Sequence, residues 1–116
     1  MKWVTKDVTV FLQAKEYVDT AVVPLLPITL GGQMKQAVEM GEFCMMLTRQ
    51  LEKQLHGRIF LMPSFTYLQS EPVEERLSRL KMWLRELKNH FDHLFLITSD
   101  SDWKRIENQL GNTLIW

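Results

Sequence analysis

The stretch FLITSDSDWKRI (Phe95–Ile106) decides the fold class. An apolar run ends in small polar and acidic residues, Thr98 to Asp102, and a helix-like pattern follows. In α/β proteins this order of residues marks the carboxyl end of a strand, where ligands often bind. The stretch therefore predicts an α/β sheet. It also raises the question of whether the polar turn binds a ligand or only begins a helix.

The rest of the chain repeats this alternation of strands and helices. Strands are expected near 20–23, 58–62, 93–98 and 113–116, and helices near 5–17, 33–56, 72–89 and 101–110. Such alternation favours parallel pairing through right-handed crossovers. We predict a three-layer α/β fold with about four mostly parallel strands in the order 2-1-3-4 and two helices on each face. The segment 64–71 is expected to be a loop.

Pro24 is the main difficulty for this strand order. The order places the first strand inside the sheet, where proline has no N–H to donate to a neighbour. Either the strand ends at Val23 or it carries a bulge at Pro24.

Two helices have readable apolar stripes. The pattern near 72–89 is the more regular, and its steps of three and four predict a core-facing helix; its apolar residues are Val73, Leu77, Leu80, Leu84, Leu87 and Phe91. The stripe near 33–56 is broader, and it comprises Met34, Ala37, Val38, Gly41, Cys44, Met45, Thr48, Leu51 and Leu55. Gly57 is expected to end this second helix, because glycine tolerates a positive φ.

Length and composition limit the function classes. The 116 residues, with 46% apolar residues and a net charge of zero, fit one domain spanning 1–116. A nucleic-acid-binding protein normally carries a basic excess, so this charge balance argues against nucleic acid as a partner. The longest apolar run, AVVPLLPI, has 8 residues, whereas a bilayer-spanning helix needs roughly 20. Membrane insertion is therefore not expected.

The compartment follows from the cysteine content and the N-terminus. The single cysteine, Cys44, cannot form an internal disulfide, which favours a reducing compartment. The segment MKWVTKDVTV carries Lys6 and Asp7 where a signal peptide needs an apolar core. The sequence predicts a soluble cytoplasmic protein.

The N-terminal quarter of the chain resembles a known family. Trp3, followed by FLQAKEYVDTA (Phe11–Ala21) and the proline-interrupted VVPLLPI, resembles the start of the YpiF-like family. These are small bacterial proteins of unknown function from spore-forming Gram-positive species. The resemblance implies no catalytic residue. It also implies that a C-terminal segment is missing from this chain, because members of the family usually continue past this point.

One candidate ligand site lies at the expected carboxyl edge of the sheet. Gly31 and Gly32 would free the backbone before a helix N-terminus, a common place for a phosphate, and the other candidates are Ser64, Thr66, Ser99 and Asp100. No Gly-rich phosphate motif is present, and two carboxylates would repel an anion unless a divalent cation lay between them. The alternative is that Ser99, Asp100 or Ser101 caps the short helix. Capping is favoured, and a nucleotide or phosphorylated-metabolite site, in a sensor or small hydrolase, is the second hypothesis.

No residue pattern indicates catalysis, a resident cofactor or a metal. His90, Asp92 and His93 have metal-like spacing, but the helix must end across them and no third ligand is near in sequence. Cys44 lies in an apolar stripe with nothing nearby to lower its pKa, so a nucleophilic role is not expected. The chain is predicted to be non-catalytic.

A partner surface is the remaining hypothesis. Met40 and Met46 belong to a methionine cluster wider than one helix face, so at least one of them is expected to point outward. Trp116 ends an apolar strand that is expected to form an exposed sheet edge. We therefore expect binding of a protein partner or a second copy of the chain.

Overall fold

A computed structural model describes residues 1–110 together with the backbone of Leu114 and Ile115. The strands are β1 (Thr20–Ile28), β2 (Ile59–Leu61), β3 (Phe65–Leu68), β4 (His93–Ile97) and β5 (Leu114–Ile115). The helices are α1 (Thr5–Gln13), α2 (Met34–Gln54), α3 (Val73–Lys88), α4 (Ser101–Lys104) and the short 3-10 helix η1 (Glu107–Gln109). The sheet has the order β2-β1-β4-β5, with β3 also paired to β1, and every pairing is parallel.

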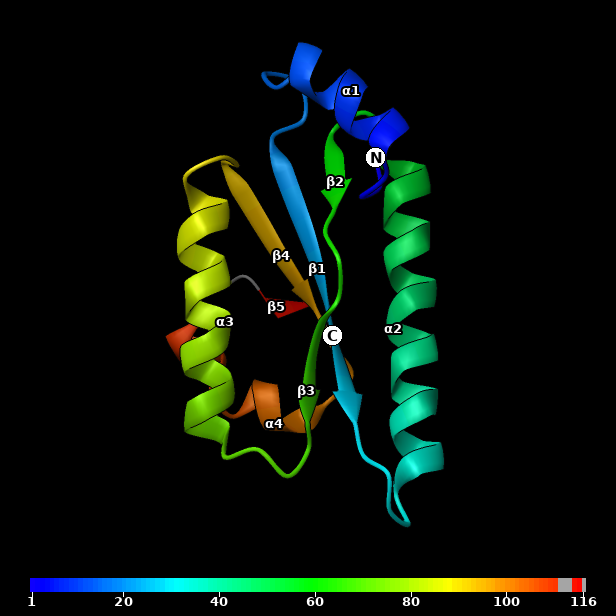
Figure 1. The fold of residues 1–116 in the computed structure, drawn as a ribbon, viewed down its shortest axis with the longest axis vertical. Coiled ribbons are helices and arrows are strands. Elements are labelled where there is room, and N and C mark those ends of the chain that lie inside the picture. The colour runs from blue at the N-terminus through cyan, green and yellow to red at the C-terminus, as the bar shows by residue number, and fades with distance from the viewer. Residues whose placement is uncertain (111–113, 116) are drawn as a thin grey trace.

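The predicted fold class and strand order are confirmed. The four strands expected from the sequence correspond to β1, β2, β4 and β5, and they lie in the predicted order. The sheet stands between α2 and α3 (Figure 1). Gly57 has a φ of 89° just after α2, as expected for the residue that ends that helix.

The loop expected at 64–71 is wrong in part, because Phe65–Leu68 forms β3. This strand continues the β2 side of the sheet: β1 pairs with β2 as far as Val22 and with β3 from Leu25 onward. Between those pairings, three residues (62–64) stand opposite two residues of β1 (23–24), which is the geometry of a bulge. In the sequence, Pro63 suggests that the strand has ended, whereas a strand begins again at Phe65, two residues later.

The same bulge explains why β1 tolerates Pro24. Thr20, Val22 and Ile28 make their backbone bonds toward the β2–β3 side of the sheet. Backbone directions alternate along a strand, so Pro24 faces the same side and meets the bulge, where no ladder donor is needed. β1 is therefore one strand of nine residues. It neither ends at Val23 nor carries the bulge itself.

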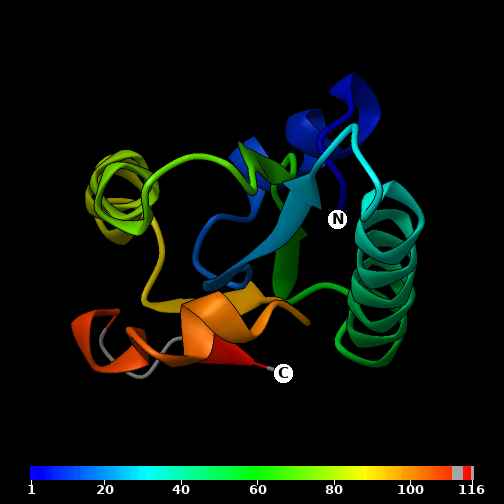
Figure 2. The ribbon, with the colours of Figure 1, turned by 90° about the horizontal axis from the view of Figure 1, so that it is seen from below.

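The helices divide unequally between the two faces, which corrects the expected two on each. α2 alone packs its buried residues against the cluster of Val22, Ile59, Leu61 and Ile97. α3 and α4 contribute to the larger cluster on the other face, and α1 lies across the amino end of the sheet, as the two views together show (Figures 1 and 2). α1 also ends at Gln13, earlier than the expected 17, and the last helical region splits into α4 and η1.

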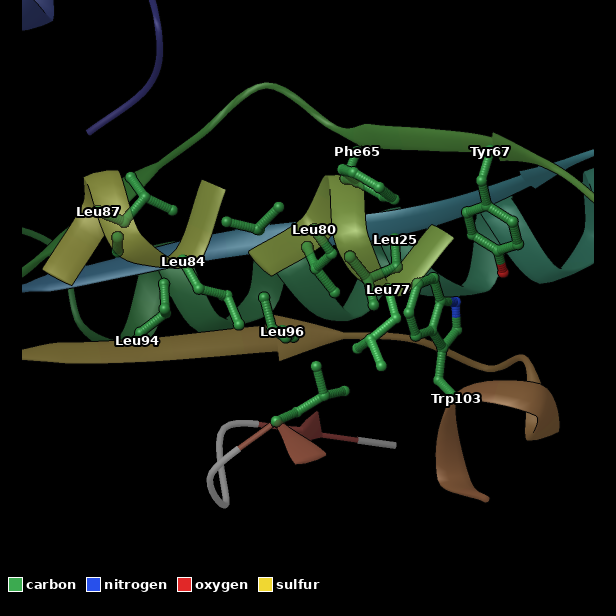
Figure 3. Close-up of a cluster of buried hydrophobic side chains, with 13 residues drawn as sticks. Leu25, Phe65, Tyr67, Leu77, Leu80, Leu84, Leu87, Leu94, Leu96 and Trp103 are labelled. Carbon is green, nitrogen blue, oxygen red and sulfur yellow. The ribbon is translucent and has the colours of Figure 1, made fainter. Parts of the chain in front are cut away.

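The cluster under α3 is the main core (Figure 3). Leu77, Leu80, Leu84 and Leu87 are all 8% exposed or less, as the regular stripe predicted. They meet the alternate residues of β1, β3 and β4 that face this side, including Leu25, Phe65 and Leu96. Each fully buried leucine contributes about 1.5–3 kcal/mol by removal from water, so α3 secures most of this face.

Figure 1 shows α2 running the length of the sheet. In the described part of the chain, no helix combines the length and apolar character that crossing a bilayer requires.

Candidate functional site

The turn after β4 is an ordered helix cap. Asp100 is 5% exposed, and its Oδ1 accepts a hydrogen bond of 3.0 Å from the backbone N–H of Asp102, the second residue of α4. Thr98 Oγ1 accepts from the backbone N–H of Asp100 at 3.0 Å. The predicted capping role therefore has its geometry in Asp100.

A second bond to Asp100 links the turn to β3. Tyr67 donates its hydroxyl proton to Asp100 Oδ2 at 2.6 Å, and both side chains are buried. Burial, followed by the hydrogen bond to the carboxylate, raises the pKa of the Tyr67 phenol. The phenol thus stays a neutral donor, and both carboxylate oxygens of Asp100 are used inside the protein.

Arg76, which the sequence analysis did not single out, completes this polar cluster. Its guanidinium is 4% exposed and donates to the carbonyls of Gln69 (2.8 Å) and Glu71 (3.0 Å) and to Asp102 Oδ2 (3.3 Å). It also lies over the ring of Tyr67, 5.0 Å from the centroid. One signal was available: Arg76 is three residues after Val73 and four before Leu80, so it occupies the core-facing stripe of α3.

Trp103 fills the space beneath the cluster. Its indole is 1% exposed and meets the rings of Phe65 and Tyr67 edge-on. The indole N–H points toward the Tyr67 hydroxyl (Figure 3), although it makes no hydrogen bond of good geometry. Its proximity offsets a small part of the rise in the pKa of that phenol. The cluster of Tyr67, Arg76, Asp100, Asp102 and Trp103 thus fastens α4 to β3 and α3.

The other predicted ligand-site residues are spread over several positions. The hydroxyl of Ser99 donates to the backbone carbonyl of Met40 at 3.1 Å, toward α2. Gly31 and Gly32 lie in the exposed loop before α2, and a Cβ added at either would meet open space. Ser64 lies before β3, with Oγ 3.8 Å from Met45 Sδ. Ser64 lies in the bulge between β2 and β3, and Thr66 lies exposed within β3, so neither stands at the carboxyl edge of the sheet.

The residues considered for metal binding and for nucleophilic chemistry make contacts within the protein. His90 Nε2 lies 3.3 Å from Glu86 Oε1 on α3, and the backbone N–H of His93 donates to the Asp19 carbonyl. Within residues 1–110, no group of three or more His, Cys, Asp or Glu side chains is placed to hold a metal ion. Burial raises the pKa of the Cys44 thiol to about 11, and its Sγ donates to the carbonyl of Ile97 at 3.0 Å.

The outer side of α2 carries the predicted methionines. Met46 is 49% exposed and Met40 is half-buried. Phe43, which the sequence analysis did not single out, is 47% exposed between them. Half-buried Leu47 packs partly against the core under α2 and borders them, and together these side chains form a strip at helical spacing, called here the α2 patch: Met40, Phe43, Met46 and Leu47. Trp116 lies outside the described residues.

This geometry defines an α/β protein with a parallel sheet. The polar side chains at the carboxyl end of β4 bond within the protein, and the long helix α2 carries apolar side chains on its surface. The chain matches the family "Protein of unknown function (DUF2487)" over residues 9–116. It is also 41% identical over 115 residues to "Uncharacterized protein YpiF" of Bacillus subtilis (strain 168), which covers 99% of this chain and 76% of that relative.

The chain therefore belongs to the DUF2487 family, and the resemblance drawn from Trp3 and residues 11–28 is confirmed. No solved structure matched the chain.

Proposed function

We propose that this protein is a non-catalytic protein-interaction or regulatory module of the cytoplasm and that it binds its partner through the α2 patch. The partner is another protein or a second copy of this chain. The observation that carries the proposal is the exposure of Phe43 and Met46, which are 47% and 49% exposed on the outer side of a helix already anchored on its inner side.

The chemistry of the α2 patch suits protein binding. Methionine is flexible and polarisable, so it adapts to a partner surface, and aromatic side chains are frequent anchors at interfaces. Apolar side chains at i, i+3 and i+7, here Met40, Phe43 and Leu47, form a continuous strip along a helix. A strip of this kind on a chain of zero net charge favours an apolar partner surface over a nucleic acid.

The buried thiol of Cys44 supports the cytoplasmic part of the proposal. Among the residues that the structure describes, Cys44 is a free cysteine, and its Sγ serves as a hydrogen-bond donor inside the core. A reducing compartment keeps such a thiol in this form.

Photo-crosslinking in the native cytoplasm tests this proposal. A photoreactive amino acid at position 43 should give a discrete crosslinked product, either with one partner or with a second copy. The same amino acid at Lys81, an exposed position on α3, serves as the matched control. Products that are absent at 43, or equal at 43 and 81, would remove the α2 patch as the binding surface.

The ligand-binding hypothesis at Gly31, Gly32, Ser64, Thr66, Ser99 and Asp100 stays a prediction. It has less support, because the carboxylate of Asp100 and the hydroxyl of Ser99 already bond within the protein. A thermal-shift panel of nucleotides and phosphorylated metabolites with divalent cations would test it. A ligand at ten times its Kd stabilises a protein by about 1.4 kcal/mol, and the Asp100→Ala and Ser99→Ala variants should lose that shift.

A further inference from the structure

The amino end of the sheet holds an apolar cavity on the side opposite α2. It lies between α1, β2 and the last turns of α3, and its volume is about 360 Å³. A second hollow of about 390 Å³ adjoins it, and the two share Trp3, Met62, Glu86 and Leu87. Volumes in this range are typical of small-molecule pockets.

Aromatic rings form the wall of the first cavity. The rings of Phe11, Phe60 and Phe91 lie with centroids 4.9 to 6.3 Å apart, and Trp3 stands edge-on to Phe60 at 6.0 Å. These residues come from the N-terminal segment with α1, from β2 and from the end of α3, so packing between these three parts builds the wall. Rings fixed in this way give a preformed apolar surface.

The inner face of α1 is only partly covered by this packing. Leu12 lines the cavity yet is 59% exposed, and Trp3 is 60% exposed. Val8 and Phe11, on the same face, are half-buried, and none of the residues of α1 is fully buried. An apolar body placed in the cavity would remove this surface from water, at roughly 25 cal/mol for each Å².

The charged groups at the rim indicate the head group of such a ligand. Lys15, Glu86 and His90 line the cavity. Glu86 Oε1 and His90 Nε2 lie 3.3 Å apart at the end of α3. Lys15 has no carboxylate within 4.0 Å among the described residues, so its ammonium group is a cation beside the apolar wall that can pair with an anionic ligand.

From this charge complementarity we infer that the cavity is a binding site for a small amphiphile with an apolar body and an anionic head, such as a fatty or aryl carboxylate. The body lies against Phe11, Phe60 and Phe91, and the head pairs with Lys15. This site is separate from the α2 patch, and neither hypothesis depends on the other.

Three probes with the same apolar body test the inference: octanoate, octanol and octylamine. In calorimetric titrations of the full chain, octanoate should bind about threefold tighter than octanol, which reflects one solvent-exposed charge pair, and octylamine should bind most weakly. In NMR spectra the probes should shift the resonances of Trp3 and Phe91. Absence of these shifts with all three probes overturns the cavity as a site, and equal affinity for the three heads overturns the anionic assignment.

Two matched pairs of variants locate the contacts. Lys15→Gln should lower octanoate affinity about threefold and leave octanol affinity unchanged, whereas Lys6→Gln, on α1 but outside the cavity, should change neither. Leu12→Glu should lower octanoate affinity further, because it adds a carboxylate at the mouth of the cavity. Its control is Val10→Glu, since Val10 is 49% exposed and does not line the cavity. Equal losses within either pair would contradict the assignment, and exposed positions were chosen so that all four variants fold.

Discussion

α2 and α3 cover opposite faces of one sheet, yet they use their side chains differently. The 16 residues of α3 include five buried ones, four of them leucines. The 21 residues of α2 include three, Ala37, Cys44 and Thr48, all of them small. Small side chains let α2 approach the sheet closely: a Cβ added at Gly41 would lie 3.7 Å from Leu26 Cδ2. The large apolar side chains of α2 are therefore left at its flanks and outer side.

This difference separates a helix that holds the fold from one that also presents a surface. The outward residues of α3 are mostly charged, such as Glu74, Lys81, Arg85 and Lys88. On α2, Met34, Val38, Phe43 and Met46 are between 47% and 51% exposed. α3 has one exposed large apolar side chain, Met82, against these four on α2, and this difference supports the proposed binding role of α2.

The largest expected effect is on the α3 side. Leu80→Ala should lower the free energy of unfolding by about 2–5 kcal/mol, because Leu80 is fully buried and its removal leaves a cavity. Phe43→Ala, which removes a larger side chain from α2, should change it by only about 0.5 kcal/mol. Urea denaturation monitored by circular dichroism measures both values. Similar losses for the two variants would end the distinction between the helices.

The polar cluster at the end of β4 should show the next largest effect. Asp100→Ala removes the cap of α4 and leaves the buried Tyr67 hydroxyl without its acceptor, for a combined loss of about 2–3 kcal/mol. Tyr67→Phe removes the hydroxyl that donates to Asp100. The double variant should therefore lose less free energy of unfolding than the sum of the two single losses. Ser99→Ala, at the neighbouring position, is the control, and additive losses for Tyr67 and Asp100 would contradict the observed bond.

Much of this architecture was readable from the sequence. The regular stripe of α3 and the order of four strands follow from periodicity and alternation, and Asp100 was among the three residues expected to cap α4. β3 was missed because it has four residues, follows Pro63 directly and exists only by pairing with the second half of β1. Arg76 was missed because an arginine in a stripe suggests an exposed edge, whereas here carbonyls of the β3–α3 loop satisfy its guanidinium.

The surfaces were less predictable than the fold. Met34 and Val38 were placed in the buried stripe of α2 but are 49% and 51% exposed, because Ala37, Gly41 and Cys44 already fill the narrow contact with the sheet. The cavity under α1 had no local signal, since its aromatic wall combines residues from α1, β2 and the end of α3. Patterns within one element cannot predict such contacts.

The buried thiol of Cys44 on α2 also predicts that the free energy of unfolding depends on pH. The folded protein raises the pKa of Cys44 from 9.0 to about 11 through burial, so the folded state holds the thiol proton more tightly than the unfolded state. This contribution to stability is complete below pH 9 and is lost as the pH rises toward 11. Unfolding free energies measured across this range should fall more steeply for the wild type than for Cys44→Ala. Equal slopes would show that the thiol is open to solvent.

The smallest expected effect tests the central claim most directly. We would measure the unfolding free energy of the double variant Phe43→Ser, Met46→Ser in urea. If these side chains are kept for binding and not for folding, the value should lie within about 1 kcal/mol of the wild type, as for two surface substitutions. A loss of about 3 kcal/mol or more, typical of buried side chains, would place Phe43 and Met46 in the core and contradict the α2 patch.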